Sequence, residues 1–512
     1  MAEKETPNPE NTPHLDTMVT MPSSNVHNQP TQKDELTPHD HERAAAEEKE
    51  AWIVKFEEVD TENPKNFKTW YKIFLTFQMS MLAFAGSLGS SIVSPGQSDI
   101  GDDFHVSDEV ASLTLSLFVL GWAFGPMFWA PISETYGRKM AMLPAVFVYG
   151  LFSIGSATSR NITSLLVTRF IAGIFASAPI SNVPAALGDI FAPRTRGTAM
   201  TFVSLCIVGG PTMGPIIGSA LEVNPHLRWR WTEYLEAIFI FTIFALALLT
   251  LPETYAPVIL VRKAKRLRKE KQDERYWHPH EKERIDIKNV LSKHISRPIR
   301  MFFTEPILMF IALYASFVYG IVYFTLEAFP IVFHEQRGYP LVVSTLPFLG
   351  VLVGVLSALL VNLGNQPRYA RALERNNGNP VPEARLPPLF IGGVCLVVGL
   401  FWFGWTAAPR FSWVLPVAAG AFIGAGFNII FQQCLNFLVD TYGPFAASAV
   451  SANTMLRSLV ACGLPLAVRP MFNNLGVGPG CSLLGGIAVL ALPVPWLLTR
   501  YAAVLRTKGS KA

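Results

Sequence analysis

Residues 306–330 read PILMFIALYASFVYGIVYFTLEAFP, a stretch whose only charged side chain is Glu327. A helix needs about 20 predominantly apolar residues to cross the hydrocarbon core of a bilayer, which is about 30 Å thick. Other stretches share this character, and 50% of all residues are hydrophobic whereas only 16% are charged. The sequence therefore predicts an all-α polytopic membrane protein with twelve transmembrane helices, at 72–93, 110–131, 140–159, 163–183, 198–220, 233–251, 306–330, 342–363, 387–407, 412–436, 446–468 and 481–500.

The predicted spans form two sets of six, separated by a charged insert. We expect a disordered tail at 1–71, because its first part is rich in Pro, Asn, Thr, His and Glu and has no apolar stretch. A first six-helix half follows at 72–251, then a basic central loop at 252–305, a second half at 306–500 and a short tail at 501–512. Halves of similar length are expected of a parallel internal duplication.

Basic residues mark one side of the predicted membrane. Because the number of spans is even, both termini, the central loop and the connector after the eighth span lie on the same side, and the side rich in Lys and Arg is the cytoplasm. We therefore expect the N- and C-termini to be cytoplasmic. We also expect a multi-pass protein of the plasma membrane, with the vacuolar membrane as the alternative. The central loop could also bind lipid headgroups or a partner. Its basic residues are RKAKRLRKEK at 262–271, Arg275, Lys282, Arg284, Lys288, Lys293, Arg297 and Arg300.

The connectors on the predicted outer side have a different character. The connector after the first span is acidic, which fits the outer face. Asn161-Ile162-Thr163 forms an N-glycosylation sequon on that side, although it lies very close to the predicted membrane surface. The acidic residues are Asp99, Asp102, Asp103, Asp108 and Glu109.

The connector between the second and third spans reads APISETYGRK at 130–139. Gly137 allows the tight turn that so short a connector needs. Glu134 lies at a helix end, and Arg138 and Lys139 follow the turn. Such charges can pair across neighbouring helix ends in one conformation and separate in another, so the connector predicts a latch between two states. Alternatively, it is only a turn and a topology signal.

Two spans carry unusual residues. Arg169 is a lone cation in the fourth span, where a charge is costly and usually functional. The alternative is that its side chain snorkels to the outer interface. The fifth span reads GGPTMGPIIGSA at 209–220. Its glycines recur every four residues and share one face, which lets a neighbouring helix approach closely. The alternative is that this face serves helix packing alone. Its prolines bend the helix, as a sliding gate would need. These residues are Gly210, Pro211, Gly214, Pro215 and Gly218.

Further polar side chains inside the spans are candidates for a central cavity. Burial disfavours the charged form of a carboxylate, so an intramembrane glutamate can take up and release a proton. Pairing within the bundle or simple packing is the alternative for each residue. The candidates are Glu236, Tyr319, Tyr323, Glu327, Asn428, Gln432 and Arg457.

Several of these motifs resemble the major facilitator superfamily, and in particular its fungal twelve-span drug:proton antiporters. The signature loop of the superfamily is G-x-L-a-D-r-x-G-R-K. Gly137, Arg138 and Lys139 match it, while Ala130 replaces the first glycine and Glu134 replaces the aspartate. The resemblance covers roughly residues 60–505, and it implies a major facilitator fold.

Two more motifs extend the resemblance. Arg169 and Gly173 match R-x-x-q-G, and the resemblance assigns this arginine to proton coupling. The fifth span matches G-x-x-x-G-P-x-x-G-G at Gly210, Gly214, Pro215 and Gly218, with serine in the last position. This motif marks exporters more than importers.

The resemblance implies proton-coupled export of a hydrophobic small molecule, such as a drug or a fungal toxin of the cercosporin-like polyketide type. An importer or polyamine-type carrier, or a non-transporting receptor, is the alternative. No P-loop motif GxxxxGK[ST] occurs, so we expect an ion gradient to supply the energy. We expect no enzymatic activity, no cofactor, no metal and no nucleic-acid partner, and we expect a monomer embedded in a lipid bilayer.

Overall fold

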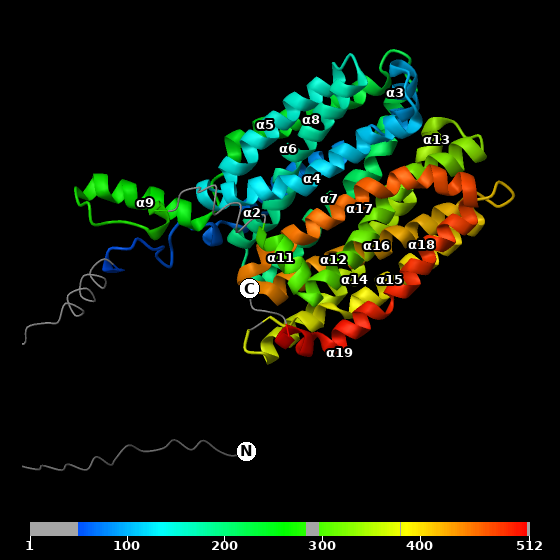
Figure 1. The fold of residues 1–512 in the computed structure, drawn as a ribbon. Helices are drawn as coiled ribbons and strands as arrows, with labels where there is room; N and C mark the ends of the chain where they lie inside the picture. The colour runs from blue at the N-terminus through cyan, green and yellow to red at the C-terminus, as the bar shows by residue number, and fades with distance from the viewer. Residues whose placement is uncertain (1–49, 283–295, 379, 509–512) are drawn as a thin grey trace, which may run out of the picture. The chain divides into compact units, whose positions relative to one another are not determined.

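The structure is a computed structural model that describes residues 50–282, 296–378 and 380–508. Within these ranges the secondary structure is helical, apart from one isolated β-bridge between Ile53 and Trp277. Twelve helical segments of the described chain are long and apolar enough to cross a membrane. The predicted all-α fold with twelve spans is therefore confirmed (Figure 1).

In the first half, α2 (Thr69–Gly89) continues through η2 (Ser94–Gly96) into α3 (Gln97–Phe104). The other helices of this half are α4 (Asp108–Tyr136), α5 (Arg138–Ala157), α6 (Ile162–Ile190), α7 (Pro193–Glu222) and α8 (Arg228–Thr250). The connecting segment contains α9 (Ala256–Lys271), η3 (Pro279–Lys282) and α11 (Arg297–Thr304). The helices of the second half are α12 (Pro306–Phe329) with its continuation η5 (Pro330–Gln336), α13 (Leu341–Thr345), α14 (Phe348–Arg375), α15 (Pro387–Thr406), α16 (Val414–Tyr442), α17 (Ala446–Leu475), α18 (Val477–Ala491) and α19 (Pro493–Lys508).

Several helices are longer than the predicted spans. For example, α6 continues to Ile190 and α17 to Leu475, each seven residues beyond the predicted end at 183 and 468. Hydropathy detects only the part of a helix that the bilayer requires to be apolar, whereas the helix itself continues past the membrane surface.

The two halves repeat the same order of helix pairing. In the first half α2 packs on α7, α4 and α5 pack on α6, and α5 packs on α8. In the second half α12 packs on α17, α14 and α15 pack on α16, and α15 packs on α18. This correspondence is what a parallel duplication produces. The halves meet mainly where α4 lies against α17 and α7 against α14.

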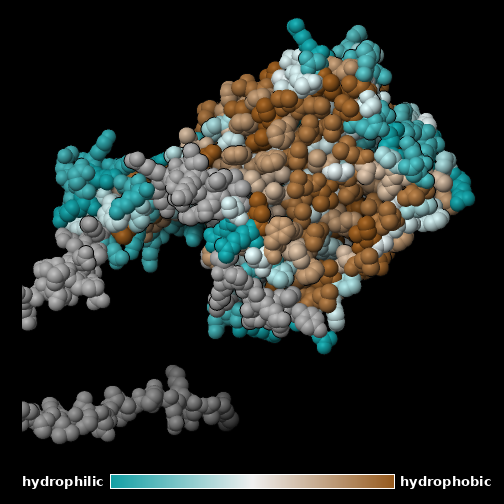
Figure 2. All heavy atoms as spheres, in the orientation of Figure 1, coloured by the Kyte–Doolittle hydropathy of each residue, from teal (hydrophilic) through white to brown (hydrophobic). Residues whose placement is uncertain are grey.

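The surface shows where the bilayer lies. Figure 2 shows a broad hydrophobic band over the helices between two hydrophilic ends. Large apolar side chains such as Leu249, Leu360 and Leu490 are more than 70% exposed, as expected of a surface that faces lipid. We call the hydrophilic end where α2 begins and α9 lies the α9 end, and the opposite one the α3 end.

Part of the predicted disordered tail is folded. Val54 packs with Leu260 and Ala264 of α9. Lys263 Nζ lies 2.5 Å from Asp60 Oδ2 and lowers the pKa of that carboxyl. The structure therefore corrects the predicted tail for residues 53–68, because apolar and charged groups of α9, distant in the sequence, give this polar segment a surface to fold on. The remaining tail at 1–49 and the basic residues Arg284, Lys288 and Lys293 lie outside the described residues.

The glycine face of α7 packs directly on α2 and η2. A Cβ atom built on Gly210 would lie 2.6 Å from the carbonyl carbon of Ser87 and 2.7 Å from the nitrogen of Leu88. The corresponding atoms on Gly214 and Gly218 would overlap Ser91 and Ile92. The predicted close approach of a neighbouring helix is therefore present, and α2 is that neighbour.

Pro211 also contributes to this contact. Proline has no N–H, so the carbonyl of Ile207, four residues earlier, loses its usual helical donor. The hydroxyl of Ser87 donates a hydrogen bond to that carbonyl. One residue of α2 thus touches the glycine face and satisfies the carbonyl that the adjacent proline leaves free.

Gly210→Ala should destabilise the protein by about 1–3 kcal/mol, because the added methyl group collides with backbone rather than with a movable side-chain tip. Gly209→Ala is the matched control, since its Cβ would meet nothing within 4 Å. Thermal unfolding of the purified variants, monitored by size-exclusion chromatography after heating, measures the difference in stability. Equal melting temperatures for the two variants would contradict the assigned packing.

Candidate functional site

Arg169 of α6 is fully buried inside the first half. Its Nη1 lies 3.1 Å from Oε1 of Glu233 and 3.7 Å from Oε2 of Glu236, both on α8. Its Nη2 donates to the carbonyl of Gly89, 2.6 Å away, and its Nε donates to the carbonyl of Thr114, 3.1 Å away. All three nitrogens of the guanidinium therefore have acceptors, and the snorkelling alternative does not apply.

The acceptor on α2 exists because that helix ends at Gly89, and carbonyls at a helix end lack intrahelical donors. Glycine is also required there for space, because a Cβ would overlap Glu236 and Tyr149. The guanidinium lies over the ring of Phe118, with Cζ 4.3 Å from the ring centroid. Arg169 thus binds groups from α2, α4 and α8.

Glu236 extends the cluster to α5. The hydroxyl of Tyr149 donates to Oε1 of Glu236, and the hydroxyl of Ser153 lies 3.4 Å from the same atom. The predicted residues Arg169 and Glu236 are therefore brought together. Glu233 was not predicted as a site residue, although its spacing of three from Glu236 places both on one helix face. We call Arg169, Glu233, Glu236 and Tyr149 the buried charge cluster.

The short connector at the α9 end is organised by Glu253, another residue that sequence reasoning did not select. Its carboxylate accepts hydrogen bonds from the backbone N–H groups of Arg138, Thr254 and Tyr255, at 2.8, 2.9 and 3.0 Å. Gly137 has φ of 102°, and a Cβ there would overlap this carboxylate. The carboxylate caps the N-terminus of α5, where negative charge is stabilised.

Arg138 forms the ion pair of this connector. Its Nε lies 3.0 Å from Oδ2 of Asp189 at the end of α6, and its guanidinium lies 4.7 Å from the ring centroid of Tyr255. The side chain of Lys139 donates to the carbonyl of Leu248. Glu134 pairs with no cation among the described residues. Asp189 is therefore the acid that holds Arg138, whereas the sequence had suggested Glu134.

The second half has an equivalent arrangement. Arg385, just before α15, lies 3.0 Å from Asp440 of α16, and the hydroxyl of Tyr369 on α14 donates to the same carboxylate oxygen at 2.8 Å. The ion pair thus joins corresponding elements in the two halves: the start of α5 with the end of α6, and the start of α15 with the end of α16. This agrees with the parallel duplication.

Tyr319, Tyr323 and Arg457 lie together in the second half. The guanidinium of Arg457 on α17 lies 4.6 Å from the ring centroid of Tyr319 and 5.0 Å from that of Phe431. The hydroxyl of Tyr323 is 2.8 Å from that of Ser90, the residue that follows α2, so this group borders the first half. Glu327 is buried further towards the α3 end of α12, beside Gln97 of α3.

The predicted amides Asn428 and Gln432 join α16 to α7. Gln432 Nε2 donates to Thr201 Oγ1 at 2.7 Å, and Ser204 Oγ donates to Asn428 Oδ1 at 3.4 Å. Asn362 of α14 completes the network by donating to Gln432 Oε1 at 2.6 Å. These amides connect the halves in the part of the bundle nearer the α9 end.

Contacts at the α3 end also cross between the halves. Ser219 of α7 is 2.8 Å from Thr345 of α13, and Arg469 of α17 is 3.8 Å from Asp108 of α4. Polar groups of the two halves therefore meet at both ends of the bundle.

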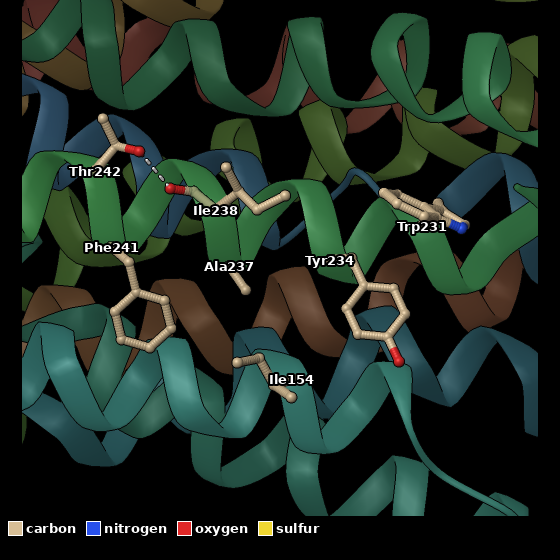
Figure 3. A pocket seen from close by; sticks show the side chains of 7 residues that line it. All are labelled: Ile154, Trp231, Tyr234, Ala237, Ile238, Phe241 and Thr242. Atoms are coloured by element: carbon tan, nitrogen blue, oxygen red, sulfur yellow. Dashed lines mark hydrogen bonds between the residues drawn. The ribbon is translucent and has the colours of Figure 1, made fainter.

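A hollow of about 610 Å³ lies on the flank of α8 beside α5 (Figure 3). Trp231, Ile238 and Ile154 on its wall are exposed, and the polar Thr242 hydroxyl donates to the carbonyl of Ile238. With no charged residue in its lining, this hollow belongs to the lipid-facing surface and is separate from the buried charge cluster.

Asn161 caps the N-terminus of α6. Its Oδ1 accepts a hydrogen bond from the backbone N–H of Ser164 at 2.7 Å, and the residue is exposed at the α3 end. The side chain already has a structural function, and its glycosylation stays a prediction.

Residues 79–465 match the Major Facilitator Superfamily. The chain belongs to this superfamily. It is 41% identical over 459 residues to "Efflux pump bik6" of Gibberella fujikuroi, and the aligned region covers 89% of this chain and 94% of that protein. It is 37% identical to "Major facilitator superfamily multidrug transporter FLU1" of Candida albicans, covering 91% of this chain and 77% of that protein. The predicted family is confirmed, and the protein is a multi-pass membrane transporter.

Two further comparisons agree. "Citrinin biosynthesis cluster MFS transporter mrr1" of Monascus ruber is 41% identical, covering 87% of this chain and 89% of that protein. Among solved structures, the partially occluded inward-open xylose transporter XylE from E. coli superposes with a TM-score of 0.59 at 18% identity, covering 83% of this chain and 99% of that one. The likeness to XylE concerns the fold alone.

Glu253→Gln should destabilise the transporter by about 1–3 kcal/mol, because one amide oxygen replaces a charged carboxylate that accepts several backbone hydrogen bonds. Glu134→Gln, in the connector that Glu253 caps, is the control and should change stability far less. Thermal unfolding of both variants in detergent measures the effect. A larger loss for Glu134→Gln than for Glu253→Gln would contradict the assignment.

Proposed function

We propose that this transporter is a proton-driven exporter of small hydrophobic molecules, and that the buried charge cluster binds the proton. In the cluster, one guanidinium faces two carboxylates, and all three side chains are fully buried. The cluster is neutral when it carries one proton and has a net charge of −1 when it carries none. A surrounding of low polarity favours the neutral form, so a proton is an expected constituent of this site.

The depth of the cluster supports proton entry from outside. We place the α9 end in the cytoplasm of a plasma-membrane protein, since the basic residues of α9 and of the connector after α14 lie there. Arg169 is the eighth residue of α6, which begins at the α3 end, so it lies about 12 Å along the helix at 1.5 Å per residue. Protons from the outer side therefore have the shorter path to the cluster.

A proton gradient is sufficient for this task. One proton moving through about 100 mV releases roughly 2.3 kcal/mol. One pH unit adds roughly 1.4 kcal/mol, and together these sustain a concentration ratio of about 500 for each proton exchanged.

Export is supported by the relatives and by α7. The relatives include a protein named as an efflux pump, one named as a multidrug transporter and one named for a citrinin biosynthesis cluster. The glycine and proline pattern of α7 resembles that of antiporters, and in this structure it forms the contact with α2. We propose a fungal secondary metabolite or a hydrophobic drug as the substrate.

Glu236→Gln should abolish accumulation driven by a pH gradient, because the neutral amide leaves no exchangeable proton on that side chain. The assay is uptake of radiolabelled citrinin or cycloheximide into everted membrane vesicles with an acidic interior. Accumulation should fall at least about tenfold, towards simple equilibration, since coupling to the gradient is lost.

Glu109→Gln removes an exposed carboxylate at the α3 end and should retain normal accumulation. Full accumulation by Glu236→Gln at normal expression would refute this assignment of the proton site, and full accumulation by Glu233→Gln as well would exclude the whole cluster. Gradient-driven uptake only into right-side-out vesicles would instead favour an importer.

A further inference from the structure

Arg457 differs from Arg169 in what surrounds it. Both arginines are buried, with Arg457 4% exposed. Arg169 faces two carboxylates, whereas no carboxylate of the described residues lies within ion-pairing distance of Arg457. The Nε atom of Arg457 is buried and has no hydrogen-bond acceptor in the described part of the chain. The guanidinium is thus a buried cation without a counter-charge.

Aromatic rings supply the surroundings of this cation. Arg457 lies against Tyr319 and Phe431, and Tyr319 lies 5.7 Å from Phe427 and 5.8 Å from Phe431, measured between ring centroids. Phe427 and Phe431 are stacked, with centroids 5.8 Å apart. Ring faces attract a cation, but they do not replace the water or the counter-ion that burial removes. An anion that reaches this group would supply the counter-charge that the described residues do not.

The position of the group suits a transported ligand. Tyr319 and Arg457 lie near the middle of α12 and α17, far from both hydrophilic ends. Tyr323, one helical turn from Tyr319, contacts Ser90 of the first half. The group therefore borders the interface that opens when the two halves of such a transporter move, which is where midplane substrate sites lie.

We propose that Arg457 and the rings of Tyr319, Phe427 and Phe431 bind the substrate, and that this substrate is an organic anion with a planar apolar body. The carboxylate or acidic enolate of the substrate pairs with the guanidinium, and the planar body packs on the rings. This inference rests on the proposed transport function, and it narrows the substrate class.

The test compares each of two planar acids with its uncharged amide. Purified protein in lipid nanodiscs is titrated at pH 7.5 with radiolabelled 1-naphthoate and 1-naphthamide, and with pyrene-1-carboxylate and its amide. At least one acid should bind about tenfold or more tightly than its amide, as expected for a charge-assisted hydrogen bond. Equal affinities within both pairs, or binding of neither acid, would overturn the proposal.

Variants assign this preference to one residue. Arg457→Gln should abolish the preference for the acid, and Arg457→Lys, which retains the charge, should keep part of it. Arg371→Gln removes a positive charge from an exposed position of α14 and should leave the preference unchanged. If Arg457→Gln still prefers the acid over its amide, the proposal is overturned. It is also overturned if radiolabelled chloride binds in a way that depends on Arg457 while neither acid binds.

Binding in nanodiscs requires neither a proton gradient nor a direction of transport. Preference for the acid combined with absence of gradient-driven efflux would sustain this inference and refute the exporter. Gradient-driven efflux without preference for the acid would support the exporter and refute this inference.

Discussion

The burial of Arg169 is the constraint on which the first half of the bundle depends. Burying a guanidinium in the interior of a membrane protein is costly, and surrounding carboxylates and carbonyls offset that cost. Here the surrounding groups come from α2, α4 and α8, and Glu236 brings in α5 through Tyr149. One side chain of α6 therefore contacts groups that four other helices supply, including the carbonyl of Gly89 at the end of α2.

The two halves share an architecture but use their buried arginines differently. Each half repeats the same helix pairing and the same ion pair at the α9 end, formed by Arg138 and Asp189 in one half and by Arg385 and Asp440 in the other. Within the described residues, the first half surrounds its intramembrane arginine with acids. The second half surrounds Arg457 with rings. We infer a division in which the first half binds the proton and the second half binds the substrate.

The sequence predicted much of this architecture, because hydropathy and helical periodicity are local properties. The twelve spans and the glycine face of α7 are examples. Partnerships between distant residues could not be predicted this way. Glu233 is 64 residues from Arg169, and Glu253 is 115 residues from Arg138, so no local pattern connects them. The same limit explains why the segment at 53–68 looked disordered, since its apolar partners lie on α9.

We propose that the buried charge cluster carries a proton that it can release. Infrared difference spectroscopy of the purified protein, recorded as the pH is raised, detects the carbonyl stretch of a protonated carboxyl group directly. We expect one such band from a buried site, which titrates in the wild type and changes or disappears in both Glu233→Gln and Glu236→Gln. A spectrum without a titrating buried carboxyl band, or with a band that neither substitution alters, would contradict it.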